Sequence, residues 1–205
     1  MLNLPNILTS LRLVLSVVFV WIMSFEGLIS SYLALLVFVI AALTDWLDGY
    51  LARRLNQTTA FGIFMDPFAD KFLILSALLV FLWLNLIPVW MVLVILAREF
   101  IVTSLRILGE TRGVAIAAIP SGKQKTVSQI VAVIGILVLL CAQYTIVRLT
   151  GTPWDTFLSR SSRAGIVAAY LMEILPDVLI FIAMVFSVIS GFDFISKHRH
   201  LFQKL

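Results

Sequence analysis

The chain is organised around residues 44–71, which read TDWLDGYLARRLNQTTAFGIFMDPFADK. This segment contains Asp45, Asp48, Asp66 and Asp70, which are four of the eleven acidic residues in the chain. Long apolar runs flank it on both sides. An ionised side chain at the edge of a hydrocarbon phase is energetically costly, so acids in this position indicate a functional site rather than ordinary surface.

The spacing of these acids predicts two carboxylate-bearing helix faces. Asp45 and Asp48 stand three residues apart on one helix, and Asp66 and Asp70 stand four apart on the next, so each pair shares a face. If the faces meet, four negative charges repel one another unless cations neutralise them. Carboxylate oxygens suit Mg²⁺ or Mn²⁺, and two such ions side by side are the usual apparatus for displacement at phosphorus. The segment therefore predicts a site for two divalent cations.

A structural alternative for the acids is pairing with the bases of the same segment. These bases are Arg53, Arg54 and Lys71. Three bases cannot neutralise four acids, so the metal site is the better interpretation.

Small residues accompany the acids and complete a motif. Small side chains let a ligand or a second helix approach the backbone closely. The segment matches the pattern D-x2-D-G-x2-A-R-x8-G-x3-D-x3-D at every specified position, namely Asp45, Asp48, Gly49, Ala52, Arg53, Gly62, Asp66 and Asp70. This pattern resembles the signature of the CDP-alcohol phosphotransferases, and eight specified positions at fixed spacing make a chance match improbable.

The resemblance implies a role for each residue of the motif. It implies that Asp45, Asp48, Asp66 and Asp70 ligate the two cations and that Asp70 is also the catalytic general base. It further implies nucleotide binding by Asp45, Gly49, Ala52, Arg53, Gly62 and Asp66.

The composition predicts a membrane protein. Of 205 residues, 61% are hydrophobic and only 13% are charged, and the mean hydropathy is +1.09. The single cysteine, Cys141, excludes a disulfide framework or a cysteine-based metal site. No linker or internal repeat divides the sequence, so we expect one membrane domain over residues 1–205.

The apolar runs predict an all-α polytopic protein with six transmembrane helices. A spanning helix needs about 20 mostly apolar residues. Six segments qualify, covering approximately residues 7–25, 31–55, 66–86, 89–108, 126–148 and 171–192. Pro5 and Asn6 resemble a helix start, so we also expect a short interfacial helix at the N-terminus, with Arg12 extending to the membrane interface. Pro176 is expected to mark the entry to the sixth helix.

The distribution of bases predicts the orientation. With six spans, twelve of the fifteen Lys and Arg residues lie on the side that also holds both termini and the acidic motif. Basic residues are enriched on the cytoplasmic side of membrane proteins. We therefore expect a protein of the cytoplasmic (inner) membrane, with its termini and site facing the cytoplasm.

A second cluster of charge precedes and opens the fifth span. Arg98 and Arg106 stand eight residues apart on the fourth span, and Lys123 and Lys125 follow Gly122. Bases at membrane depth are costly unless they bind something, and a phosphate is the natural ligand for convergent Arg and Lys. Anchoring to lipid headgroups is the alternative. Glu99 is expected to orient a neighbouring base by pairing with it.

These later elements resemble the bacterial phosphatidylglycerophosphate synthase branch of the family. The resemblance implies transfer of a phosphatidyl group from CDP-diacylglycerol to glycerol 3-phosphate, with release of CMP and with Arg98, Arg106, Lys123 and Lys125 holding the acceptor phosphate. It also implies a homodimer in membrane lipid and no nucleic-acid partner. Two alternatives stay open: the same chemistry with inositol phosphate, serine or phosphatidylglycerol as acceptor, or a membrane transporter.

Overall fold

A computed structural model of the chain describes residues 4–55, 60–111, 120–154, 156–157 and 163–202. Within these residues six long helices are present, and no strand is found. They are α1 (Leu4–Met23), α2 (Leu28–Leu55), α3 (Ala60–Trp83), α4 (Val89–Thr111), α5 (Pro120–Thr150) and α7 (Arg163–Phe202). The expected all-α class is confirmed.

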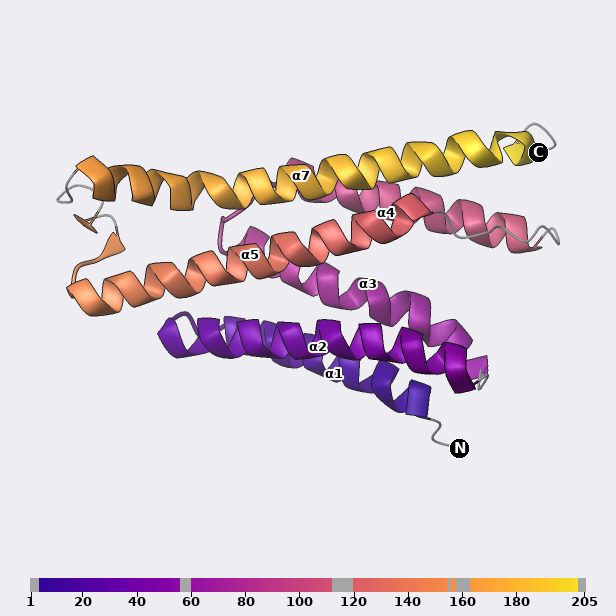
Figure 1. Ribbon diagram of the computed structural model, residues 1–205, viewed down its shortest axis with the longest axis horizontal. Helices are drawn as coiled ribbons and strands as arrows, with labels where there is room; N and C mark the ends of the chain where they lie inside the picture. The colour runs from indigo at the N-terminus through magenta and orange to yellow at the C-terminus, as the bar shows by residue number, and fades with distance from the viewer. Residues whose placement is uncertain (1–3, 56–59, 112–119, 155, 158–162, 203–205) are drawn as a thin grey trace.

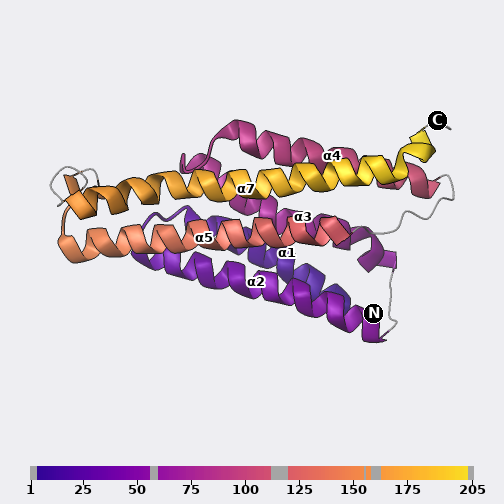
Figure 2. The same cartoon turned by 45° about the horizontal axis from the view of Figure 1, so that its top comes forward.

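The helices form an elongated bundle in which successive helices run in alternating directions (Figure 1). The start of α1, the end of α2, the start of α3, the end of α4, the start of α5 and the end of α7 all lie toward one end of the bundle, on the right in Figure 1. We call this the motif end, because the end of α2 and the start of α3, which carry the acidic motif, are located there. Helix α1 packs against α2 and α3, α5 packs against α7 and α2, and α4 packs against α7. Figure 2 shows α4 alongside α7 from a second direction.

The core of the bundle is made of large apolar side chains from most of the helices. Phe19 of α1 and Phe38 of α2 pack with their ring centroids 5.8 Å apart and are fully buried. Ile136 of α5 and Ile180 of α7 are buried in the same core. Many other large apolar side chains face outward, such as Trp21 and Phe100. An apolar exterior around an apolar core is the pattern of a bundle surrounded by lipid.

Two helices are long and apolar enough to cross a membrane within the described residues. They cover Gly122–Thr150 of α5 and Gly165–Lys197 of α7. Shorter apolar stretches lie in α1, α2 and α3, at Ser10–Met23, Leu28–Thr44 and Lys71–Trp83. These findings indicate a helical membrane protein. They do not confirm the expected number of six spans.

Three sequence-based expectations about helix ends are wrong. The expected separate interfacial helix is not found, because α1 continues from Leu4 to Met23 with Pro5 tolerated in its first turn. Helix α5 begins at Pro120 rather than near residue 126, so Lys123 and Lys125 belong to its first turns. Pro176 lies inside α7, which begins at Arg163. Proline is tolerated inside membrane helices because neighbouring groups satisfy the backbone carbonyl that it leaves free.

A tight turn follows the end of α3, between the third and fourth predicted spans. The Leu86 amide donates to the Phe81 carbonyl at 2.9 Å, and the Asn85 amide donates to the Leu82 carbonyl at 3.0 Å. Asn85 itself adopts a left-handed conformation with φ of 55°. Asparagine tolerates this region better than most residues, which explains how α3 ends so abruptly.

Replacing Phe38 with Ala is expected to lower the free energy of unfolding by about 3 kcal/mol, because it leaves a cavity against Phe19. The measurement is the midpoint of thermal unfolding in detergent. Leu36→Ala is the control, since Leu36 lies on the same helix with 56% of its surface exposed. Equal shifts for the two variants would show that this ring pair is not part of the core.

Candidate functional site

The acidic motif lies on two antiparallel helices at the motif end. The backbones of Asp45 and Asp48 belong to the last part of α2, and those of Asp66 and Asp70 belong to the first half of α3. The two helices contact each other, and Figure 1 places both segments at the same end of the bundle. The backbones of the two acid pairs therefore lie on neighbouring helices, as the predicted metal site requires.

The side chains of residues 45–70 lie outside the part that the structure describes. This range includes the predicted metal ligands and the predicted nucleotide-binding residues Gly49, Ala52, Arg53 and Gly62, so their contacts stay predictions. Among the side chains that are described, no group of three or more His, Cys, Asp or Glu is placed to hold a metal ion.

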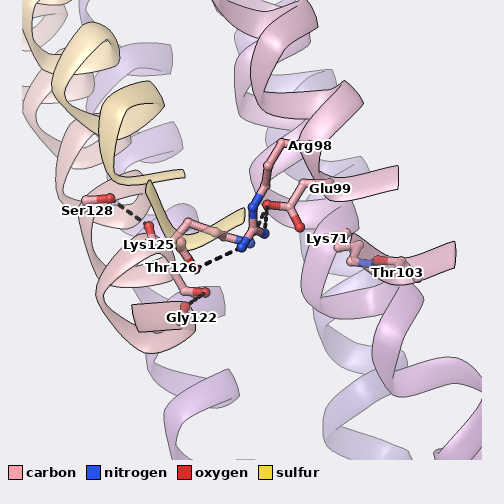
Figure 3. Close-up of polar contacts among 9 residues, drawn as sticks. Lys71, Arg98, Glu99, Thr103, Gly122, Lys125, Thr126 and Ser128 are labelled. Atoms are coloured by element: carbon pink, nitrogen blue, oxygen red, sulfur yellow. Dashed lines mark hydrogen bonds and ion pairs between the residues drawn. The ribbon is translucent and has the colours of Figure 1, made fainter. Parts of the chain in front are cut away.

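A partly buried polar cluster joins three helices near the motif end, and its charged members are drawn in Figure 3. The Nη1 atom of Arg98 donates to Oε1 of Glu99 at 3.1 Å. The same carboxylate oxygen forms an ion pair with Nζ of Lys125 on α5. The Nη2 atom of Arg98 donates to Oγ of Ser190 on α7 at 2.8 Å. We call these four residues the basic cluster.

The basic cluster carries an excess positive charge away from water. The side chains of Arg98, Glu99 and Lys125 are 11%, 15% and 12% exposed. Two cations share one carboxylate, so the described members of the cluster have a net charge of +1. A partly buried excess cation attracts an anion more strongly than the same charge at an exposed surface would. The expectation that Glu99 orients a base is confirmed, and it orients two.

A second contact connects the acidic segment with the helix that bears the cluster. Nζ of Lys71, the residue after Asp70, donates to Oγ1 of Thr103 on α4. Thr103 lies four residues after Glu99, so both residues are on one face of α4. Figure 3 shows the contact between Lys71 of α3 and Thr103 of α4 beside Arg98 and Glu99. Helix α4 thus links the end of the acidic motif to the basic cluster.

The other two predicted phosphate ligands make none of the contacts that define the cluster. Arg106 and Lys123 are both exposed. Lys123 lines a groove of about 540 Å³ between α5 and α7, together with apolar side chains that include Val131 and Phe186. The structure therefore brings together Arg98 and Lys125 but not Arg106 and Lys123.

Sequence reasoning missed the roles of several residues in this region. Thr103 and Ser190 carry no charge, and no role was predicted for either of them, so only their contacts show that they hold Lys71 and Arg98. Arg12 was expected to extend to the interface, but it is only 3% exposed. It is buried on α1, the helix that packs against both helices of the acidic motif.

These features define a class of protein: a helical membrane protein with an acidic motif on two neighbouring helices and a partly buried basic cluster toward the same end. A family model described as CDP-alcohol phosphatidyltransferase matches residues 2–189. The chain therefore belongs to the CDP-alcohol phosphatidyltransferase family, and the resemblance seen in the sequence is confirmed. Members of this family are generally dependent on divalent metal ions.

Characterised relatives resemble the chain over most of its length. A Bacillus subtilis (strain 168) protein named CDP-diacylglycerol–glycerol-3-phosphate 3-phosphatidyltransferase is 36% identical over 210 residues, covering 97% of this chain and 96% of the relative. Proteins of the same name from Escherichia coli (strain K12) and Shigella flexneri serotype 5b are each 40% identical over 145 residues, covering 66% of this chain and 76% of the relative.

Proposed function

We propose that this protein transfers the phosphatidyl group of CDP-diacylglycerol to glycerol 3-phosphate, producing phosphatidylglycerophosphate and CMP. The observation that carries the proposal is the link, through Lys71 and Thr103, between the acidic motif and a partly buried cluster of net positive charge. Such a link supports the proposal, because it would bring a cationic group suited to phosphate close to the predicted two-metal site. The similarity to enzymes of this name over nearly the whole chain supports the same substrates.

The acidic motif suits a pair of divalent cations. Asp45, Asp48, Asp66 and Asp70 would hold two ions of Mg²⁺ or Mn²⁺, since the donor set consists of carboxylate oxygens alone. When bound, such ions neutralise the donor's pyrophosphate and the charge that develops on departing CMP.

Asp70 is the proposed general base. Its carboxylate takes the proton from the primary hydroxyl of glycerol 3-phosphate, and that oxygen attacks the phosphorus atom that bears diacylglycerol. The bond from this phosphorus to the CMP oxygen breaks as the new bond forms. Asp45 and Asp66 also contact the nucleotide, Gly49, Ala52 and Gly62 leave room for it, and Arg53 lies near its phosphates.

Arg98 and Lys125 are the proposed ligands of the acceptor's phosphate. Both are cationic, mostly shielded from water, and held by one carboxylate that cannot neutralise both. Arg106 and Lys123, exposed and outside the cluster, contribute a positive field that attracts the anionic acceptor toward the site.

The proposal includes six spans in the cytoplasmic (inner) membrane, with a site that faces the cytoplasm. Both the start of α1 and the end of α7 lie at the motif end (Figure 1), where the sequence places most of its bases. A site at this end would meet water-soluble glycerol 3-phosphate from one side and CDP-diacylglycerol laterally from the membrane. The exposed apolar surface leaves room for the homodimer that the resemblance implies.

The test of this function is CMP release by the purified protein in detergent with CDP-diacylglycerol, Mg²⁺ or Mn²⁺, and a panel of acceptors. The panel contains glycerol 3-phosphate, inositol phosphate, serine and phosphatidylglycerol. We expect release only with glycerol 3-phosphate and only with metal. Release that depends on another acceptor would keep the family chemistry and overturn the proposed substrate.

Lys125→Ala is expected to raise the KM for glycerol 3-phosphate by about 10-fold, since it removes one charged contact to the phosphate. Lys123→Ala is the matched control, because it removes the same charge from the same helix but outside the cluster. We expect Lys123→Ala to change this KM by less than about two-fold, in line with the weak effect of exposed charges. Equal effects of the two variants would mean that the cluster is not the phosphate site.

A further inference from the structure

Helix α7 supplies the surface on which Arg98 rests. The hydroxyl of Ser190 is the acceptor for Nη2 of Arg98, and Ser190 itself is only 3% exposed. Nη1 of Arg98 is bound by Glu99 from its own helix. The two terminal nitrogens are thus fixed by partners on different helices. A planar group held at both ends has one orientation, and its remaining N–H groups point in set directions.

The next residue, Gly191, has no side chain, so the Arg98 side chain can pass close to the backbone of α7. A Cβ atom at this position would lie 2.9 Å from Cγ and 3.2 Å from Nε of Arg98. The first distance is shorter than any normal carbon contact, and it falls on the stem of the side chain rather than on its free end. Nε of Arg98 is buried and has no hydrogen-bond partner within the described residues. Close packing on Gly191 therefore sets where this part of the side chain lies.

We infer that Ser190 and Gly191 are positioning residues, which orient the Arg98 guanidinium for the phosphate of the acceptor. This inference rests on the proposed function. Neither residue needs to touch the substrate, because each acts through the side chain of Arg98.

The test is a comparison of KM values for the two substrates in Ser190→Ala and Gly191→Ala. Each variant is expected to raise the KM for glycerol 3-phosphate by about 10-fold, because a displaced Arg98 guanidinium would lose about one hydrogen bond to the charged phosphate. The KM for CDP-diacylglycerol should stay within about two-fold of the wild-type value, since an interaction with only one substrate is lost.

Two matched controls exist in the same bundle. Ser187→Ala removes another buried serine hydroxyl of α7, one that has no hydrogen-bond partner among the described residues. Gly135→Ala also introduces a close Cβ contact, but with the end of the flexible Leu179 side chain, 2.8 Å away. Both controls should leave the two KM values unchanged. If Gly191→Ala fails to fold, the comparison of the KM values of Ser190→Ala and Ser187→Ala still tests the inference.

A double-mutant cycle separates positioning from general damage to the fold. Adding Ser190→Ala to Arg98→Ala should cause no further loss of kcat/KM, because the hydroxyl acts only through the arginine. Independent, multiplying losses would overturn the inference, as would a Ser190→Ala variant with an unchanged KM for glycerol 3-phosphate. A wild-type protein that does not use glycerol 3-phosphate at all would instead refute the proposed function.

Discussion

Asp70→Asn is expected to abolish turnover while leaving the protein folded. The amide cannot accept the proton of the acceptor hydroxyl, and a general base contributes about 10²- to 10⁴-fold to the rate. The loss of one carboxylate also weakens the predicted metal site, so the effect should lie at the upper end of that range or beyond. The measurement is CMP release at saturating concentrations of both substrates.

The control for this variant is Asp177→Asn, which removes an exposed carboxylate from α7 and should keep wild-type activity. Both variants should have the thermal unfolding midpoint of the wild type. If Asp70→Asn retains a rate within about 10-fold of the wild type, Asp70 is not the base, because removal of a base costs more than that. If excess Mn²⁺ restores the rate, the residue acts as a metal ligand alone.

Arg98→Ala is expected to raise the KM for glycerol 3-phosphate by about 10- to 100-fold, since it removes a charged partner of the phosphate from a site with little water. The KM for CDP-diacylglycerol should change by less than about two-fold. The KM of Arg98→Lys for glycerol 3-phosphate should lie between those of the wild type and of Arg98→Ala, because lysine keeps the charge but loses the planar pair of donors.

The Arg98 experiment is interpreted by comparing the KM values for the two substrates. Glu99 keeps its ion pair with Lys125 when the arginine is removed, so the cluster should not collapse. A parallel rise in both KM values would point to general disruption. No change in either value would mean that the acceptor's phosphate binds elsewhere.

The sequence was sufficient for the features that depend on local spacing. The acids of the motif stand three or four residues apart, which fixes their common faces as soon as the segments are helical. The apolar runs likewise located the helices, since the predicted third and fourth spans correspond to α3 and α4. The pairing of Glu99 with Arg98 was predictable because the two residues are adjacent.

The sequence could not predict contacts between helices that are distant along the chain. Arg98 and Ser190 are 92 residues apart, and Lys71 and Thr103 are 32 apart. Periodicity along one helix identifies a face but does not say which other helix covers it. For this reason the four predicted phosphate ligands were treated alike, although only Arg98 and Lys125 meet.

Rules based on a single residue type also gave wrong predictions at two positions. Pro176 has the usual signature of a helix boundary, yet α7 continues through it with the proline buried. Arg12 has the charge expected at an interface, yet it is buried in the bundle. In both cases packing against neighbouring helices prevailed over the preference of the single residue.

The central claim is that the acceptor hydroxyl attacks the phosphorus atom that bears diacylglycerol and that CMP leaves. The most direct measurement uses glycerol 3-phosphate with a heavy oxygen isotope in its primary hydroxyl, followed by mass spectrometry of the lipid and nucleotide products. We predict that the label appears in the phosphodiester of phosphatidylglycerophosphate and that CMP carries none. Label in the nucleotide product, or an unlabelled phosphatidic acid formed by attack of water, would contradict the proposed reaction.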